Sequence, residues 1–371
     1  MKALYALPDH EVVMELIPRI ADTHLSADAA VARIRAVNGL VPVAIDPESE
    51  TGGGGKVLWA DIGDHLFQEW QFMYTVQTLA QRGQIGEAFT TDFSILLDDR
   101  ILADPIYPSG LIFHVSRCGS TLTAKAIARS PRHVVLNQAG PLQRGFWATI
   151  TDDWAREAEP TPDNLRAFRN LVLAMARRRR PDQLYSFVKF ISWNTLYLDF
   201  ISKAFPEVPA VFLYRNAVEV IASVLRETTA ILWAKGRPQA GFLTGLPWRE
   251  TIDMDVKRYL AICFAEYFRV ALNAGGRVSH INYTSISPES FPVILRQGLH
   301  FEPGDGEFEL MVEQFRFHSK DDGDKTVFTS DSAEKQSAIS AEDKAMIDRE
   351  CAALMQQLDR SPDNLFVQSS G

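Results

Sequence analysis

One stretch in the first third of the chain constrains the fold more than any other part of the sequence. Residues 111–115 form a short, largely apolar run that is typical of a buried strand, and an alanine-rich pattern at 122–129 is typical of a helix. The residues between them, 116–121, read Ser-Arg-Cys-Gly-Ser-Thr. A strand, a tight loop of small residues and a helix in this order form a binding site for a phosphate-sized anion, because the first helical amides lack an internal partner and the helix dipole is positive there.

The side chains of this loop also suit an anion. Arg117 offers a fixed positive charge with forked donors, and Gly119 lets an anion approach the backbone. Ser120 and Thr121 add hydroxyl donors. An ordinary strand-to-helix turn, capped by serine or threonine, is the alternative interpretation. The loop does not have the nucleoside-triphosphatase pattern, because that motif places a lysine directly after its last glycine and here the basic residue precedes the glycine.

Composition narrows the class of protein. With 371 residues, of which 46% are hydrophobic and 23% charged, the chain can bury one large domain or a domain with an appendage. A net charge of −9 argues against a general nucleic-acid binder, which needs a basic face. The three cysteines, Cys118, Cys263 and Cys351, are far apart, which fits a reducing compartment and gives no metal-site spacing. Neither a secretion signal nor an apolar run of about 20 residues is present, so we expect a cytoplasmic protein without a membrane span or a metal.

Four later segments carry strand patterns, and helical patterns alternate with them. The strands are expected at 133–136, 184–191, 209–214 and 277–283, and the helices at 163–180, 196–205, 217–227, 255–274 and 341–358. This alternation predicts an α/β fold with a central, mostly parallel sheet of about five strands flanked by helices. In such an open sheet, ligands collect at the carboxyl ends of the strands.

Two of these segments bring further basic residues to that edge. Lys189 lies in the apolar strand 184–191, where an ammonium costs free energy unless it reaches an anion or water. A lysine that snorkels to the surface is the alternative. Arg215 follows the strand 209–214, and Ser223 comes eight residues later, about two turns into the next helix. A guanidinium and a hydroxyl in this arrangement can hold one phosphate, so the sequence predicts two anion sites at one sheet edge.

The two motifs together resemble a known family. Residues 114–122 are similar to the 5′-phosphosulfate loop, and residues 212–223 to the 3′-phosphate segment, of sulfotransferases that use 3′-phosphoadenosine 5′-phosphosulfate (PAPS). The likeness covers roughly residues 57–335 and is strongest to bacterial sulfotransferase-like proteins whose loop reads His-Val-Ser-Arg-Cys-Gly-Ser-Thr-Leu. It implies a three-layer P-loop-type domain at 57–340, after an N-terminal accessory region with a Gly-rich linker at 1–56 and before a C-terminal helix and tail at 341–371.

The resemblance also implies a reaction. A sulfuryl group would move from PAPS to a hydroxyl or amine of a small-molecule or peptide acceptor, leaving 3′-phosphoadenosine 5′-phosphate and requiring no metal. The residues it implies for the 5′-phosphate are Arg117, Cys118, Gly119, Ser120, Thr121 and Leu122; for the 3′-phosphate, Arg215 and Ser223; and for closure over the nucleotide, Ser319, Lys320 and Lys335. Arg117 and Lys189 would act on the transferring group. For the closing segment, a solvated loop is the alternative.

The acceptor's base is the weak point of this likeness. Related sequences often carry a glutamate in the loop after the second strand, but this chain has Gln138, which cannot take a proton at neutral pH. His133 is the base we predict, with His114 and His318 as further choices; an acceptor that needs no strong base is another solution. Two other function classes stay open. One is a P-loop small-molecule kinase, although the loop lysine and an acidic magnesium ligand are not evident. The other is a catalytically silent nucleotide-binding protein.

Three further segments have ordinary interpretations. The four glycines within residues 46–56 follow a polar, acidic stretch and indicate a flexible linker. The four arginines at 177–180 indicate the solvated end of the preceding helix, since basic residues favour helix C-termini. The aromatic stretch 231–250 is expected to be irregular, either a lid at the rim of a pocket or a long surface loop.

Overall fold

The computed structural model describes residues 9–47, 54–227, 229–317, 320 and 337–367. Its centre is a parallel sheet of five strands in the order β5-β6-β4-β7-β8. The strands are β4 (Pro108–His114), β5 (His133–Asn137), β6 (Tyr185–Lys189), β7 (Ala210–Tyr214) and β8 (Ser279–Asn282). All five residues of β5 and of β7 are buried, as expected for strands covered on both faces. The predicted α/β fold with a parallel sheet of about five strands flanked by helices is confirmed.

The strand order fixes where a ligand can bind. The chain runs from the central β4 to β5 at one edge and returns through β6, and β7 and β8 then extend the sheet on the other side of β4. The loops that follow β4 and β7 therefore leave neighbouring strands at the same end of the sheet. Reversal of the strand order beside β4 opens a crevice at that end.

Helices alternate with the strands along the described chain. They are α1 (Asp9–Leu16), α2 (Ala27–Ala36), α3 (Phe72–Gln81), α4 (Ser120–Ala128), α5 (Phe146–Thr151), α6 (Pro162–Met175), α7 (Leu198–Ala204), α8 (Ala217–Arg226), α9 (Ala230–Ala234), α10 (Pro238–Thr244), α11 (Val256–Asn273), α12 (Phe291–Val293), α13 (Glu307–Glu313) and α15 (Ala341–Arg360). Several begin at a side-chain cap that the sequence supplies; for α8, Asn216 accepts hydrogen bonds from the amides of Val218 and Glu219. Among the described helices, none has both the length and the apolar composition needed to cross a membrane.

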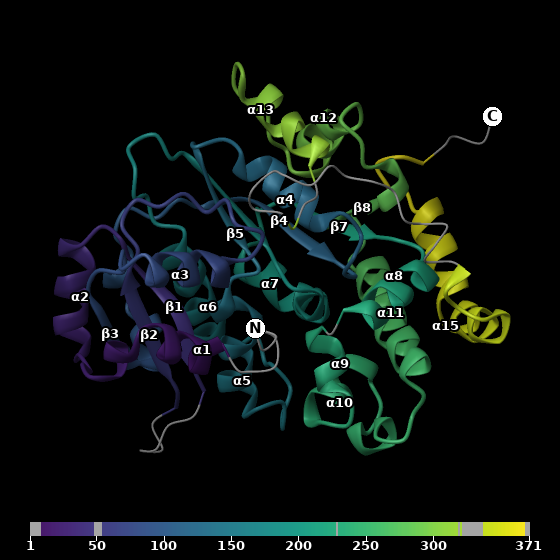
Figure 1. Cartoon of the computed structure of the whole chain (residues 1–371), viewed down its shortest axis with the longest axis horizontal. Coiled ribbons are helices and arrows are strands. Elements are labelled where there is room, and N and C mark those ends of the chain that lie inside the picture. The colour runs from purple at the N-terminus through teal and green to yellow at the C-terminus, as the bar shows by residue number, and fades with distance from the viewer. Residues whose placement is uncertain (1–8, 48–53, 228, 318–319, 321–336, 368–371) are drawn as a thin grey trace.

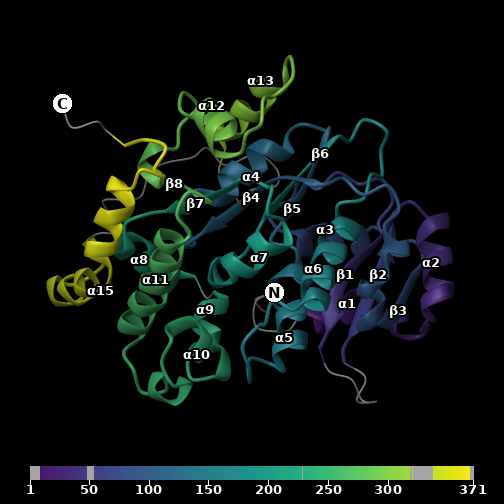
Figure 2. The same cartoon turned by 180° about the vertical axis from the view of Figure 1, so that it is seen from behind.

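A second, antiparallel sheet lies at one end of the molecule. It consists of β1 (Leu40–Asp46), β2 (Lys56–Asp61) and β3 (Ala88–Asp92), and β1 and β2 pair directly across the Gly-rich segment. Figures 1 and 2 show this sheet with α2 at one end of the molecule, and α15, which packs against α11 and α8, at the other. The accessory region before residue 57 thus shares a sheet with the residues that follow it.

The arginine run does not form a solvated helix end. Helix α6 ends at Met175, and Arg177 and Arg179 are only 3% and 6% exposed. Nη1 of Arg177 donates to the carbonyls of Ile34, Val37 and Leu40 at 2.8, 3.1 and 3.2 Å. The prediction is wrong for these two arginines because the chain after α6 passes the end of α2, whose last carbonyls need donors.

The aromatic stretch 231–250 is not irregular either. It forms α9, α10 and a 3₁₀ turn at Trp248–Thr251. Pro238 stands at the first turn of α10, and Gly245, with a φ of 68°, ends it. The short length of each helix hid the helical period from the sequence.

Candidate functional site

A cavity of about 270 Å³ lies at the carboxyl ends of β4, β6 and β7. One wall comes from the loop after β4, the end of β6, the end of β7 and the face of α8. The second comes from α1, the segment before and into α3, and the loop after β5. The lining residues are Asp9, Trp70, Gln71, Met73, His114, Ser116 to Leu122, Gln138, Gln143, Arg144, Lys189, Ile191, Ser192, Trp193, Arg215, Ser223, Glu227, Thr229, Ala230, Ile231, Tyr283, Phe317 and Lys320.

The loop after β4 has a tightly coiled backbone. Ser116, Arg117 and Gly119 have positive φ angles of 84°, 51° and 80°. Only glycine adopts such angles without cost, so the two other residues hold a strained conformation. A side chain at Gly119 would in addition come within 3.0 Å of Ile286 Cδ1. A coiled loop of this kind, followed directly by the first turn of α4, is the backbone form from which anion sites are built.

Buried side chains of the sheet hold this loop in place. The amide of Ser116 donates to Nδ1 of His114 at 2.8 Å, so Nε2 carries the proton and donates to the Phe190 carbonyl at 2.9 Å. Burial, with a smaller contribution from Lys189, lowers the pKa of His114 well below its usual value. Sγ of Cys118 donates to the Leu213 carbonyl at 3.1 Å, which ties the loop to β7. His114 therefore serves as a neutral brace, with both ring nitrogens engaged.

Lys189 lies beneath the loop as a buried cation. It is 1% exposed, and its Nζ donates to Oγ1 of Thr121 at 3.2 Å. Burial lowers the pKa of Lys189 to about 7, and the positive charges of Lys320 and Arg117 contribute to this shift. Lys189 is not a snorkelling surface residue. An anion beside it would favour its charged form.

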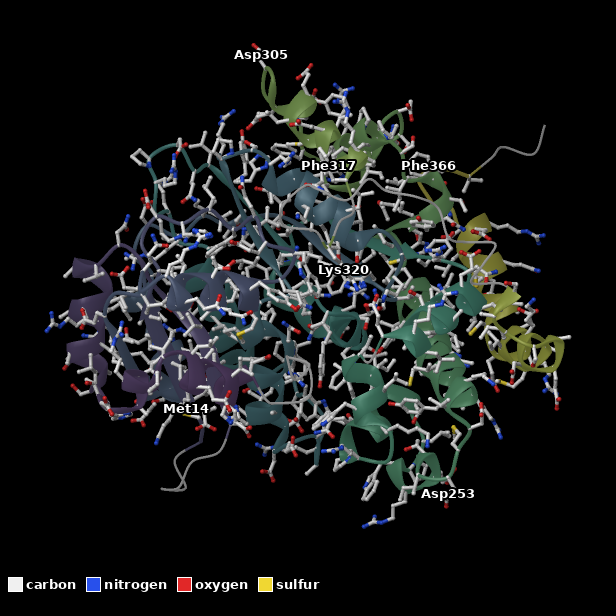
Figure 3. The ribbon with its side chains drawn as sticks, viewed as in Figure 1. Met14, Asp253, Asp305, Phe317, Lys320 and Phe366 are labelled. Carbon is white, nitrogen blue, oxygen red and sulfur yellow. The ribbon has the colours of Figure 1, made fainter. Side chains whose placement is uncertain are left out.

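Glu227 bridges two of the cations. Its Oε2 accepts from Nη2 of Arg117 and, at 2.8 Å, from Nζ of Lys320. Burial opposes ionisation of this carboxyl, but the two hydrogen bonds outweigh it and lower the pKa of Glu227 to about 2. Lys320 also lies 5.4 Å from the centre of the Trp70 ring and stands near the middle of the view in Figure 3.

Arg215 forms a second, more deeply buried pair. Its Nε donates to Oε2 of Glu219 at 2.7 Å, and Nη1 donates to the carbonyl of Arg117 at 3.3 Å. The guanidinium lies over the ring of Tyr283, 4.2 Å from its centre. Ser223 follows Glu219 by one turn of α8 and lines the same cavity. The hydrogen bond to the Arg117 carbonyl connects Arg215 to the loop that carries Arg117.

The structure brings most of the predicted site residues together. Those that line the cavity are Arg117, Cys118, Gly119, Ser120, Thr121, Leu122, Lys189, Arg215, Ser223 and Lys320. Ser319, Lys335 and His318 lie outside the described residues.

His133 is the exception. It opens β5, so it lies at the amino end of its strand and away from the edge where the cavity forms. Its Nδ1 donates to the Ile127 carbonyl at 2.7 Å, and its ring packs against Phe187 and Phe301. The prediction of a base at His133 is corrected: the imidazole is a buried packing residue.

Gln138 occupies the cavity wall in a fixed orientation. The φ angle of Gln138 is 47°, and its side-chain Oε1 accepts from Nε2 of Gln71 at 2.5 Å. Its backbone N–H donates to the Lys189 carbonyl at 2.8 Å. Nε2 of Gln143 donates to the Gln138 carbonyl. Three glutamine amides thus line this part of the wall.

Several lining residues were not predicted from the sequence. Glu219, which pairs with Arg215 but is not among the lining residues, was also missed, although the i,i+4 spacing of the two is a readable signal for an ion pair. Asp9 and Gln71 carried no such signal, because only the tertiary fold brings them to the cavity.

No known protein family and no curated protein matches this sequence. Within the described ranges, no three His, Cys, Asp or Glu side chains group closely enough to hold a metal ion. The arrangement is a cavity with Arg117, Lys189, Arg215 and several hydroxyl donors on one wall, and with glutamine amides, Asp9 and Arg144 on the other. It can bind a ligand that carries two separate anionic groups.

Proposed function

We propose that this chain transfers a sulfuryl group from PAPS to a hydroxyl or amine of an acceptor, within a P-loop-type fold. One observation carries the proposal: the loop at the end of β4, Arg215 at the end of β7 and Ser223 on α8 line the same cavity. A donor with phosphates at both its 5′ and 3′ positions needs two such groups, whereas an ordinary nucleotide needs one.

The residues present fit this donor. The coiled loop and the start of α4 offer backbone amides, with the hydroxyls of Ser120 and Thr121, to a 5′-phosphate. Arg215 and Ser223 offer a guanidinium and a hydroxyl to a 3′-phosphate. Lys189, hydrogen-bonded to Thr121, stands where it would neutralise charge on the leaving phosphate. In this reaction the protein mainly supplies alignment and fixed positive charge.

A catalytically silent nucleotide-binding protein is the second candidate. Its support is Gln138, which lines the cavity where a proton acceptor would be needed and is fixed there by Gln71. Such a protein would bind the donor without consuming it.

Calorimetric titration with adenosine 3′,5′-bisphosphate tests the donor site, with 5′-AMP and ATP with magnesium as comparisons. We expect micromolar binding of the bisphosphate and binding of AMP at least about tenfold weaker, the loss of one charge-assisted contact. Arg215→Lys keeps the charge but loses the fork, so it should weaken bisphosphate binding about tenfold. Arg226→Lys, at the exposed end of the same helix, is the matched control and should stay within about twofold.

Binding of ATP with magnesium but not of the bisphosphate would overturn the proposal in favour of a kinase. Release of the bisphosphate from PAPS across a panel of alcohols, phenols and amines then separates an enzyme from a silent binder.

A further inference from the structure

The second wall of the cavity contains a carboxylate whose role the donor site does not explain. Asp9 is the first residue of α1, and its side chain is 11% exposed. Oδ1 accepts from Nη2 of Arg144 at 3.2 Å. Oδ2 is buried and has no hydrogen-bond partner among the described residues. A buried carboxylate oxygen without a donor costs free energy, and because Asp9 lines the cavity, a ligand bound there can supply that donor.

Asp9 lies directly over the loop that follows β5. A Cβ added to Gly140 would lie 3.3 Å from Cβ and 3.5 Å from Oδ2 of Asp9. The φ of Gly140 is −47°, which any residue adopts, so the backbone conformation does not require glycine here. Its missing side chain instead makes room for Asp9. Gln138 is two residues earlier in the same loop and lines the same cavity.

We infer that Asp9 supplies the carboxylate that Gln138 cannot, and that it is the base facing the acceptor in the transfer proposed above, on which this inference rests. In this step the acceptor oxygen attacks sulfur and forms the new O–S bond. The bond from sulfur to the bridging oxygen breaks, and its electron pair leaves with the 5′-phosphate. The acceptor proton moves to Oδ2 of Asp9, while Arg144 holds Oδ1 and so orients the carboxylate.

The surroundings of Asp9 also indicate the class of acceptor. Gln71, Gln138 and Gln143 present amides to the same wall, and Trp70 and Met73 present apolar surface. The negative charge of Asp9 is matched by Arg144. This lining suits a neutral alcohol or phenol with an apolar part, whose hydroxyl donates to Oδ2.

Asp9→Asn tests the assignment because asparagine keeps the size of the side chain and an Oδ1 acceptor for Arg144 but cannot take the proton. Release of the bisphosphate from PAPS is measured with phenol as acceptor and with water alone, and bisphosphate affinity is measured in parallel. We expect the variant to lose roughly 100-fold in kcat with both acceptors, the usual effect of a general base, while bisphosphate affinity stays within about twofold. Glu11→Gln, on the exposed face of α1, is the matched control and should keep the wild-type rates.

A rescue experiment separates a base from a merely structural ion pair. Gln138→Glu in the Asp9→Asn background returns a carboxylate to the same wall, and we expect it to recover at least about tenfold of the lost kcat, part of the general-base effect. Gly140→Ala is a second variant that leaves Asp9 unchanged but crowds it, and a smaller loss of kcat with unchanged bisphosphate affinity is expected.

Each other outcome overturns the inference. Rates within about threefold of wild type for Asp9→Asn would show that no proton passes to Asp9. A joint loss of turnover and bisphosphate affinity, without recovery by Gln138→Glu, would show that the Asp9–Arg144 pair is structural only. A wild-type protein that binds the bisphosphate but releases it from PAPS no faster than buffer would also contradict it. Failure of the wild type to bind the bisphosphate would instead mean that the proposed function itself is wrong.

Discussion

Two pairs of arginines in this molecule have partners of different kinds. Arg117 and Arg215 line the cavity, and their guanidinium groups pair with the carboxylates of Glu227 and Glu219. Arg177 and Arg179 lie after α6 and donate to backbone carbonyls, three for Arg177 and that of His65 for Arg179. The guanidinium of Arg179 also lies 3.9 Å from the centre of the Phe67 ring.

The partners decide what each pair can do. A carboxylate side chain can move aside when a phosphate takes its place on the guanidinium, because both are anions that accept the same forked donors. A backbone carbonyl is fixed by the fold and cannot. Burial lowers the pKa of Arg179 to about 9, and the neighbouring charge of Arg177 adds to this shift. Burial of an arginine is therefore no sign of a binding site, whereas an exchangeable partner beside a cavity is.

The largest effect is expected for Arg177→Met, which should lower the free energy of unfolding and leave bisphosphate binding unchanged. The variant removes the donor that three backbone carbonyls share, and at about 1 kcal/mol or more for each, the free energy of unfolding should fall by roughly 3 kcal/mol. Urea unfolding measures this change. Arg180→Met is the control, because Arg180 pairs with Asp182 in solvent, and it should leave the unfolding midpoint unchanged.

Bisphosphate affinity of Arg177→Met should stay within about twofold of wild type, since the side chain is remote from the cavity. A variant with the wild-type unfolding midpoint but weaker bisphosphate binding would contradict this distinction between the two arginine pairs, because Arg177 would then contribute to the binding site.

Lys189, a third basic residue of the cavity, should make bisphosphate affinity depend on pH. Its pKa of about 7, set by burial and by the nearby charges of Lys320 and Arg117, means that neutral amine accumulates above pH 7 in the unliganded protein. A phosphate bound next to Nζ favours the ammonium, so binding takes up a proton and affinity falls as pH rises above 7, by up to about tenfold per pH unit. His114 stays neutral, and burial raises the pKa of Cys118 to about 11, so neither mimics this effect over pH 7 to 9.

Calorimetry in two buffers of different ionisation enthalpy measures the proton uptake. Lys189→Met should abolish the uptake and flatten the pH dependence. Unchanged uptake in this variant would mean that the bound anion lies away from Lys189.

The sequence predicted the parts of this molecule that depend on local pattern. The strand, loop and helix around Gly119 and the strand before Arg215 carry their own periodicity and turn chemistry, and parallel strands necessarily bring their carboxyl ends to one edge. The positions of Lys189 and Ser223 follow from the same strands and helices. The base predicted at His133 was wrong although the expected strand, 133–136, already put this histidine at its amino end, away from the edge where ligands collect.

The second wall could not be predicted in this way. Asp9 and Gln71 reach the cavity through helix packing between segments far apart in sequence, which no local pattern encodes. The same holds for Arg177, whose partners lie about 140 residues earlier in the chain.

Glu227→Gln carries the smallest expected effect and tests the comparison most directly. The substitution keeps the shape of the side chain but removes the charge that Arg117 and Lys320 share. A phosphate then no longer competes with a carboxylate, and bisphosphate affinity should rise about threefold; the gain is modest because the Glu227 side chain is 60% exposed and solvent screens the pair. Glu309→Gln, on the exposed face of α13, is the control. The gain should shrink as salt is added, which calorimetry at low and high ionic strength measures. A loss of affinity would instead show that Glu227 holds Arg117 in its binding position. Glu227 would then be a fixed partner of Arg117, as the backbone carbonyls are of Arg177.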